Sequence, residues 1–153
     1  MNKERLANRL ILHEGLRLKP YRDHLGFLTI GIGRCLDKKG ISEEEAHYLL
    51  QNDIDDATQE CIMNIDFFEK LDNIRQEVLV EMCFQLGIIG LLGFREFLYQ
   101  LGRGAYMKAA EEMLNSKWAK QDSPKRALEL SQIMSGEQIM FGENDEARIK
   151  TSL

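Results

Sequence analysis

The chain has 153 residues, of which 44% are hydrophobic and 29% charged, and a formal net charge of −5. This length and composition are typical of one globular domain. The negative charge argues against nucleic acid as a partner, because phosphate binding depends on Lys and Arg. The N-terminal segment is charged throughout, so we expect no signal peptide, no stable membrane association and a cytoplasmic product.

Residues 2–13 are predicted to form the first helix, with Asn2 as its N-cap. Short β-branched and aromatic runs interrupted by glycine follow over residues 16–35 and predict a hairpin or small meander. Ser42 and Glu45 then have the spacing of a capping box. We expect it to start a long helix over about residues 43–62.

Everything after residue 61 has the pattern of consecutive helices. The expected spans are a short helix that starts at Asp66, then residues 72–85, 94–101, 105–114 and 124–135. The last of these has proline at its first helical position, which is favourable because proline has no N–H to satisfy.

The predicted fold is α+β and predominantly helical. We expect a small α/β lobe over residues 13–60, in which the long helix 43–62 serves as a connection. An all-helical lobe over residues 61–153 would follow, with helix 2–13 packing on it. A cleft between two lobes is a common site for an extended ligand.

Three cysteines, Cys35, Cys61 and Cys83, form no C-x-x-C motif and have no histidine nearby at ligand spacing. We therefore expect free thiols and no metal site. Basic residues are concentrated in residues 1–22 and 115–126, where local patches could steer an anionic polymer despite the negative net charge.

Two acids and a hydroxyl in the N-terminal lobe suggest glycosidic-bond hydrolysis. Glu14 ends the first helix before a glycine, Asp23 follows a short strand, and Thr29 lies in the next strand. Two carboxyl groups on separate elements can face each other as acid and base. The spacing alone favours surface acids and turn chemistry over catalysis.

The whole string is more specific than the spacing. Glu14-Gly15, Tyr21, Asp23, Gly26 and the run T-I-G-I-G (residues 29–33) resemble the active-site segment of the T-even phage lysozymes, glycoside hydrolase family 24. The resemblance continues through M-C-F-Q-L-G (residues 82–87) and S-K-W-A-K-Q-D-S-P-K-R-A (residues 116–127). It covers about residues 5–135 and implies a two-lobed, lysozyme-like fold.

The resemblance also implies residue roles. Phe84 and Gln85 would line the saccharide cleft, and Arg126 would lie beside Glu14 and hold its carboxyl group. Each has a simpler interpretation as an ordinary helix residue. Trp118 is most simply a core anchor, because a tryptophan buries a large area.

One position departs from the family pattern. The family commonly has histidine after G-I-G, where this chain has Arg34. Arg34 is predicted to be a permanent positive partner that keeps Asp23 ionised, and to be part of the substrate site. The neighbouring Cys35 replaces an aliphatic residue.

The resemblance implies a muramidase that hydrolyses the β-1,4 bond between N-acetylmuramic acid and N-acetylglucosamine of bacterial peptidoglycan, with no cofactor. Glu14 would be the acid, Asp23 would stay ionised, Thr29 would bind the attacking water, and the configuration would invert. The alternatives are a lytic transglycosylase and a catalytically weak peptidoglycan-binding protein on the same fold. By analogy the protein would be a monomeric phage endolysin that waits in the host cytoplasm for a holin.

Overall fold

The computed structural model describes residues 1–136. Two compact units are recognised, Met1–Leu50 and a second unit that begins at Gln51. The boundary between them falls inside the long helix α2 (Glu43–Asn64). Residues 137–153, the end of the predicted helical lobe, lie outside the described part of the chain.

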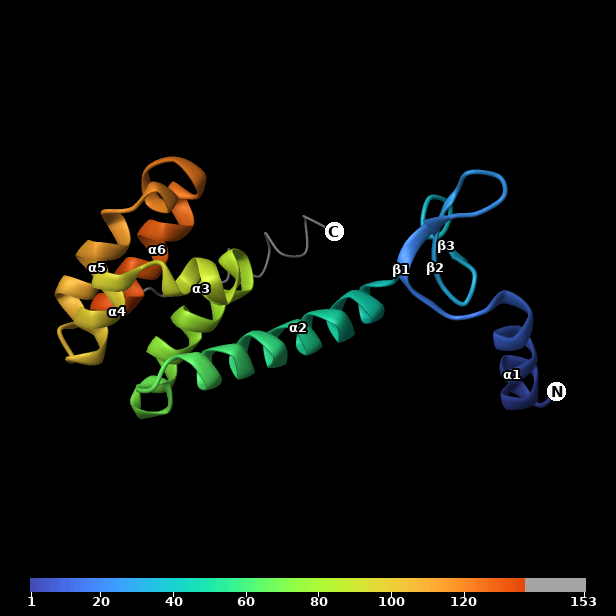
Figure 1. The fold of residues 1–153 in the computed structure, drawn as a ribbon, viewed down its shortest axis with the longest axis horizontal. Helices are drawn as coiled ribbons and strands as arrows, with labels where there is room; N and C mark the ends of the chain where they lie inside the picture. The colour runs from blue at the N-terminus through green and yellow to red at the C-terminus, as the bar shows by residue number, and fades with distance from the viewer. Residues whose placement is uncertain (137–153) are drawn as a thin grey trace. The chain divides into compact units, whose positions relative to one another are not determined.

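The first unit opens with α1 (Lys3–Glu14), whose N-cap Asn2 accepts a hydrogen bond from the Arg5 N–H. Strands β1 (Arg17–Arg22), β2 (Leu28–Gly31) and β3 (Arg34–Cys35) form an antiparallel sheet in chain order (Figure 1). The predicted helix and meander are therefore both present.

Several apolar side chains of the first unit are exposed. They line a hollow of about 890 Å³ between the sheet and the first turns of α2, to which Leu18, Ile32, Ile41, Tyr48 and Leu49 contribute. The capping box that starts α2 is formed in full. The Glu45 N–H donates to Ser42 Oγ over 3.1 Å, and the Ser42 N–H donates to Glu45 Oε2 over 2.8 Å.

The second unit contains the rest of α2 followed by helices only, among the residues described. A short 3-10 turn η1 (Phe68–Lys70) leads to α3 (Asn73–Leu92), α4 (Arg95–Gly102) and α5 (Tyr106–Leu114). A π-helical turn η2 (Trp118–Asp122) precedes α6 (Pro124–Ser135). Helix α5 packs against α4 and α6, and α3 also contacts α6 (Figure 1).

Helix α3 is longer than the sequence predicted. Glycine at position 87 leaves helical geometry (φ 71°, ψ 163°), but the chain resumes a helix at once and continues to Leu92. The prediction that the helix stops before this glycine is therefore correct for its first segment and misses the second. The helix was predicted to begin at residue 72; Asp72 is its N-cap, and its carboxylate accepts from the Arg75 N–H.

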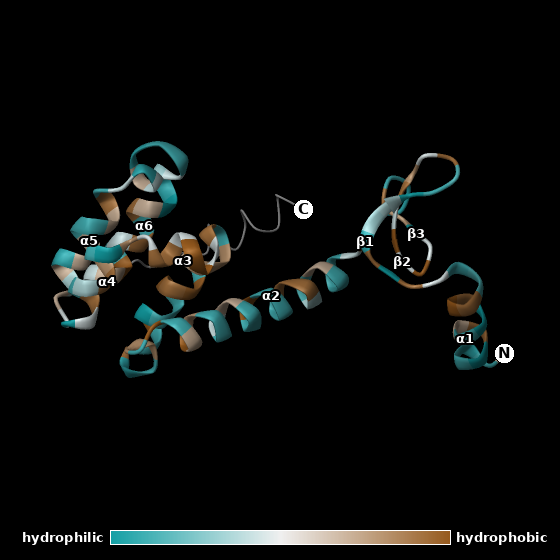
Figure 2. Cartoon of the chain, in the orientation of Figure 1, coloured by the Kyte–Doolittle hydropathy of each residue, from teal (hydrophilic) through white to brown (hydrophobic). Residues whose placement is uncertain are grey.

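The apolar core belongs to the second unit. Figure 2 shows α3 as the most hydrophobic helix in this unit, and its inward residues meet those of α4, α5 and α6. The largest fully buried side chains are Phe97, Leu79, Met82, Leu91, Leu101, Met113, Met134, Val78 and Cys61. The predominantly helical α+β fold predicted from the sequence is confirmed.

Two cysteines are part of this core. Cys61 on α2 and Cys83 on α3 are buried, and the Cys61 thiol donates a long hydrogen bond of 3.8 Å to the Leu79 carbonyl. Burial raises the pKa of the Cys61 thiol to about 12 and that of Cys83 above its ordinary value. All three cysteines are free thiols, as predicted.

Within residues 1–136, no single helix is long and apolar enough to cross a membrane. Helices α3 and α4 meet that requirement only as a pair, by length and composition, with a bend of 101° between them. The apolar residues of both helices supply much of the buried core.

Candidate functional site

Glu14 is the last residue of α1. Gly15 ends the helix at positive φ (75°), where its N–H donates to the Ile11 carbonyl. The Glu14 side chain extends toward the turn between β2 and β3. A Cβ atom added to Gly33 would lie 3.1 Å from Glu14 Oε2, so the carboxyl group lies against the backbone of this turn.

The first unit leaves Glu14 exposed. A general acid usually lies in a partly dry cleft. Glu14 has no such environment within the first unit, where its side chain is exposed.

Asp23 lies in the tight turn between β1 and β2. Its Oδ1 atom accepts two backbone hydrogen bonds, from the N–H groups of Leu25 and Phe27, each over 2.9 Å. These donors fix the orientation of the side chain. Its second carboxylate oxygen has no recorded partner among residues 1–136 and is therefore available to a ligand.

Thr29 is attached to the same turn. It lies on β2 opposite Tyr21 and Cys35 and is only 3% exposed. Its hydroxyl donates to the Phe27 carbonyl over 3.0 Å, and the backbone N–H of Asp23 donates to the same carbonyl oxygen over 3.0 Å. One peptide group thus holds Asp23 and Thr29 together, and the Thr29 oxygen remains free to accept.

The predicted contact between Arg34 and Asp23 is not present in this structure, whereas the substrate role of Arg34 stays a prediction. Its guanidinium binds Glu45 Oε1 over 2.5 Å and the Gly40 carbonyl over 3.3 Å, and no ion pair recorded among residues 1–136 involves Asp23. Glu45 lies in the first turn of α2, and its carboxylate binds the guanidinium of Arg34 on β3. Backbone N–H groups, rather than Arg34, bind the Asp23 carboxylate.

Gln85 occupies the centre of a small polar network in the helical unit. Its Oε1 accepts from the Trp118 indole N–H over 3.1 Å, and its Nε2 donates to Ser123 Oγ over 2.7 Å. Trp118 itself is 3% exposed and packs edge-to-face on Phe94 with ring centroids 5.9 Å apart. The prediction of Trp118 as a core anchor is confirmed.

Phe84 and Arg126 are both at the surface of the helical unit. Phe84 is 48% exposed and lines a hollow of about 360 Å³ with carboxylates of α2. Arg126 forms a 3.5 Å ion pair with Glu81. The contact predicted between Arg126 and Glu14 joins residues of different units and stays a prediction, as do the substrate roles of Phe84 and Gln85.

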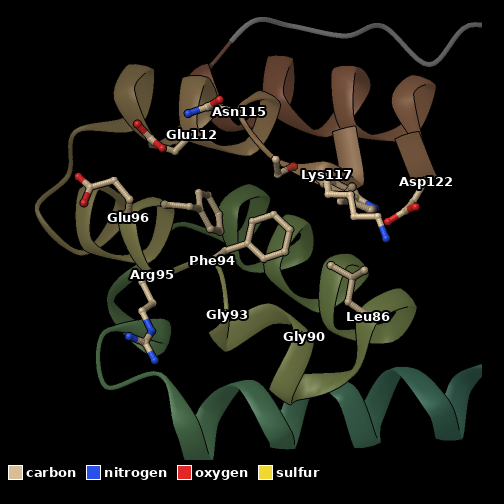
Figure 3. Close-up of a pocket in the computed structure, with 13 residues that line it drawn as sticks. Leu86, Gly90, Gly93, Phe94, Arg95, Glu96, Glu112, Asn115, Lys117 and Asp122 are labelled. Atoms are coloured by element: carbon tan, nitrogen blue, oxygen red, sulfur yellow. The ribbon is translucent and has the colours of Figure 1, made fainter. Parts of the chain in front are cut away.

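A further hollow of about 540 Å³ lies between α3, α4 and α5. Figure 3 shows the Phe94 ring in its middle, and Phe97 and Trp118 complete an aromatic floor. Its rim carries side chains of both charge signs: Arg95 and Lys117 are positive, and Glu96, Glu112 and Asp122 are negative. An apolar floor with a mixed polar rim suits a ligand that has apolar and charged groups.

Three features of these sites were not predicted from the sequence. They are the Gly33 turn against Glu14, the Phe27 carbonyl that joins Asp23 to Thr29, and the Ser123 hydroxyl on Gln85. The first two are backbone contacts, which residue types do not reveal. Ser123 was visible only as the residue before the proline that starts α6.

Comparisons with known proteins identify a family profile and several relatives. A profile described as "Phage lysozyme" matches residues 12–131. The "Probable T4-type lysozyme 1" of Dictyostelium discoideum is 29% identical over 143 residues, which cover 74% of this chain and 84% of that protein. A second one, "Probable T4-type lysozyme 2", is 27% identical and covers 80% of this chain and 88% of its own length.

A third relative is a much longer protein. The "Pre-baseplate central spike protein Gp5" of Enterobacteria phage T4 is 26% identical over 165 residues, which cover 90% of this chain but 29% of the spike protein. The family profile spans most of the chain and includes the α1 end, the sheet and the Gln85 network. The chain therefore belongs to the phage lysozyme family, the T4-type lysozymes.

Proposed function

We propose that this protein is a muramidase that hydrolyses the β-1,4 bond between N-acetylmuramic acid and N-acetylglucosamine in bacterial peptidoglycan. Its family supports the coarser statement that it is a lysozyme-type glycosidase. The observation that carries the finer proposal is the hydrogen-bonded turn in which Asp23 and Thr29 share the Phe27 carbonyl, in the same unit as Glu14.

The turn has the hydrogen-bonding capacity that a hydrolytic water needs. The Thr29 hydroxyl donates its proton to the Phe27 carbonyl. Its oxygen can therefore only accept a hydrogen bond from a water molecule. The free oxygen of Asp23 can accept the second proton of the same water. Such a water directs a lone pair away from both residues, toward the anomeric carbon.

Glu14 is the proton donor in this mechanism. It protonates the leaving glycosidic oxygen while the ionised Asp23 stabilises positive charge at the anomeric carbon. Because water rather than a carboxylate attacks, the configuration inverts. Inverting enzymes keep their carboxyl groups about 6.5–9.5 Å apart to leave room for the water.

The helical unit supplies glycan contacts in this proposal. The exposed Phe84 ring offers a face to a sugar, the Gln85 amide suits hydroxyl and acetamido groups, and Arg126 offers a cation for a carboxylate. The hollow of Figure 3, with both charges on its rim, suits the peptides attached to the glycan.

A product assay tests the proposal directly. Purified peptidoglycan is incubated with the protein, and the new chain ends are analysed for reducing sugars and for 1,6-anhydro sugars. Hydrolysis produces reducing ends with inverted anomeric configuration in the first seconds. Anhydro ends would instead indicate a lytic transglycosylase, and binding without new ends a non-catalytic wall-binding protein.

The biological setting extends this proposal. The protein would act as a monomeric endolysin that is held in the host bacterial cytoplasm and reaches the wall through a holin lesion. Co-expression in a Gram-negative host tests this setting, since lysis should require both the protein and an inner-membrane lesion. Lysis without any lesion would contradict it.

A further inference from the structure

The Gln85 network fixes the orientation of an amide. An indole N–H can only donate, so the Gln85 atom that faces Trp118 must be the carbonyl oxygen. The amide nitrogen therefore faces Ser123, where one of its two protons is donated to Oγ over 2.7 Å. The second N–H of Gln85 has no recorded partner among the residues described.

Ser123 departs from the usual behaviour of a serine at a helix start. It is the N-cap of α6, where a serine hydroxyl normally accepts from the second or third helical N–H, but its side chain makes no such bond. The hydroxyl binds Gln85 instead. Its own backbone N–H donates to the Trp118 carbonyl over 2.8 Å, which closes the network.

Residues that give up a local stabilising contact are often found at functional sites. Gln85 and Ser123 line a hollow of about 420 Å³ together with Lys125, Arg126 and Glu129. Gln85 is exposed, so its second N–H is accessible from this hollow.

We propose that Ser123 is a positioning residue that holds the Gln85 amide with its second N–H directed at a carbonyl or hydroxyl oxygen of the bound glycan. The acetamido carbonyl of an N-acetylated sugar is the acceptor class that this neutral N–H fits. The inference rests on the proposed function, because it assigns a substrate contact to the same protein.

The test compares Ser123→Ala, Ser123→Thr and a matched control, Ser135→Ala. Ser135 lies at the other end of α6, and its hydroxyl donates only to the Gln132 carbonyl of the same helix. Initial rates on soluble peptidoglycan strands give KM and kcat for each variant. The indole N–H resonance of Trp118, the only tryptophan of the chain, reports on the Gln85 contact.

Ser123→Ala is expected to raise KM by about three- to tenfold, the range for one neutral hydrogen bond, with kcat little changed. The Trp118 indole resonance should move upfield, because the released Gln85 amide binds it less firmly. Ser123→Thr should leave KM and the Trp118 resonance close to their wild-type values, because threonine keeps the hydroxyl. Ser135→Ala should leave KM and the resonance unchanged.

An unchanged KM in a folded Ser123→Ala protein would overturn the inference while leaving the muramidase proposal intact. An unmoved indole resonance would overturn it too, because Gln85 would then keep its orientation without Ser123. Absence of new reducing ends with the wild-type protein would instead refute the function on which the substrate contact rests, and with it the inference.

Discussion

Each of the two units is stabilised internally in a different way. Within residues 1–50 the only buried side chain is the polar Thr29, whereas every buried hydrophobic residue recorded belongs to the second unit. The proposed catalytic residues therefore lie where geometry depends on turns and hydrogen bonds. Packing dominates the stability of the second unit. Substitutions in the first unit should change activity, and core substitutions in the second should change stability.

The largest effect is expected at Glu14. Glu14→Gln keeps the shape of the side chain but removes the proton donor, and general acid catalysis contributes about 10²–10⁴-fold. Peptidoglycan turnover should fall at least about 100-fold. Thermal unfolding should be unchanged, because the Glu14 side chain is exposed. A folded variant with most of its activity would remove Glu14 from the mechanism.

Phe97→Ala tests the other unit. Phe97 is 1% exposed and packs edge-to-face on Phe94, so its removal leaves a cavity and should lower the free energy of unfolding by about 3–5 kcal/mol. Urea unfolding followed by Trp118 fluorescence measures the change. The matched control in the first unit, Leu18→Ala, removes an 81% exposed side chain and should change stability by less than about 0.5 kcal/mol.

Gly33→Ala tests whether backbone geometry positions the acid. The substitution places a methyl group 3.1 Å from Glu14 Oε2 at a φ of 74°. Displacement of the Glu14 carboxyl group should lower turnover about tenfold, because misplacement of a catalytic group by about 1 Å can lower a rate by about 10²-fold. Gly104→Ala is the control, because its φ is 75° and its added Cβ meets nothing within 4 Å. The control should lose stability but keep activity.

The smallest effect concerns Glu45. The backbone N–H of Ser42 and the Arg34 guanidinium lower the pKa of this carboxyl group below its ordinary value of 4.5. The carboxylate therefore stabilises the folded state above pH 4.5, and this contribution is lost as the pH falls through the lowered pKa.

Calorimetry between pH 3 and pH 6 can detect this contribution. Glu45→Gln should lower the unfolding temperature at pH 6 and flatten its fall toward pH 3. Glu44→Gln serves as control, because Glu44 has no hydrogen bond or ion pair recorded within residues 1–136. Parallel profiles for wild type and Glu45→Gln would show that the Arg34 contact has no effect on stability.

Local signals in the sequence predicted the elements well. The Asn2 N-cap, the Ser42–Glu45 capping box and the proline start of α6 were all identified correctly. Each depends on residues within one helical turn, so the sequence contains the whole cause. The extension of α3 past Gly87 was missed because its second segment is stabilised by burial of Leu91, a tertiary effect.

Pairings between elements were less predictable. Arg34 was expected on Asp23, but its partner depends on how residues 36–42 turn, and that path brings Glu45 within reach. The hydrogen bond between Gln85 and Ser123 was missed for the same reason, because it forms only where α3 packs against the start of α6. Residue types limit the possible partners of a side chain, and the tertiary path selects among them.

The core of the second unit is rich in sulfur. Cys61, Met82, Cys83, Met113 and Met134 are all buried there. Methionine sulfoxide and oxidised cysteine are polar and would not re-enter this interior. In the folded protein these atoms are sheltered, and the raised pKa of Cys61 keeps its thiol protonated and unreactive. Oxidation of these five residues therefore requires unfolding of the core, and a reductant protects them during synthesis and refolding.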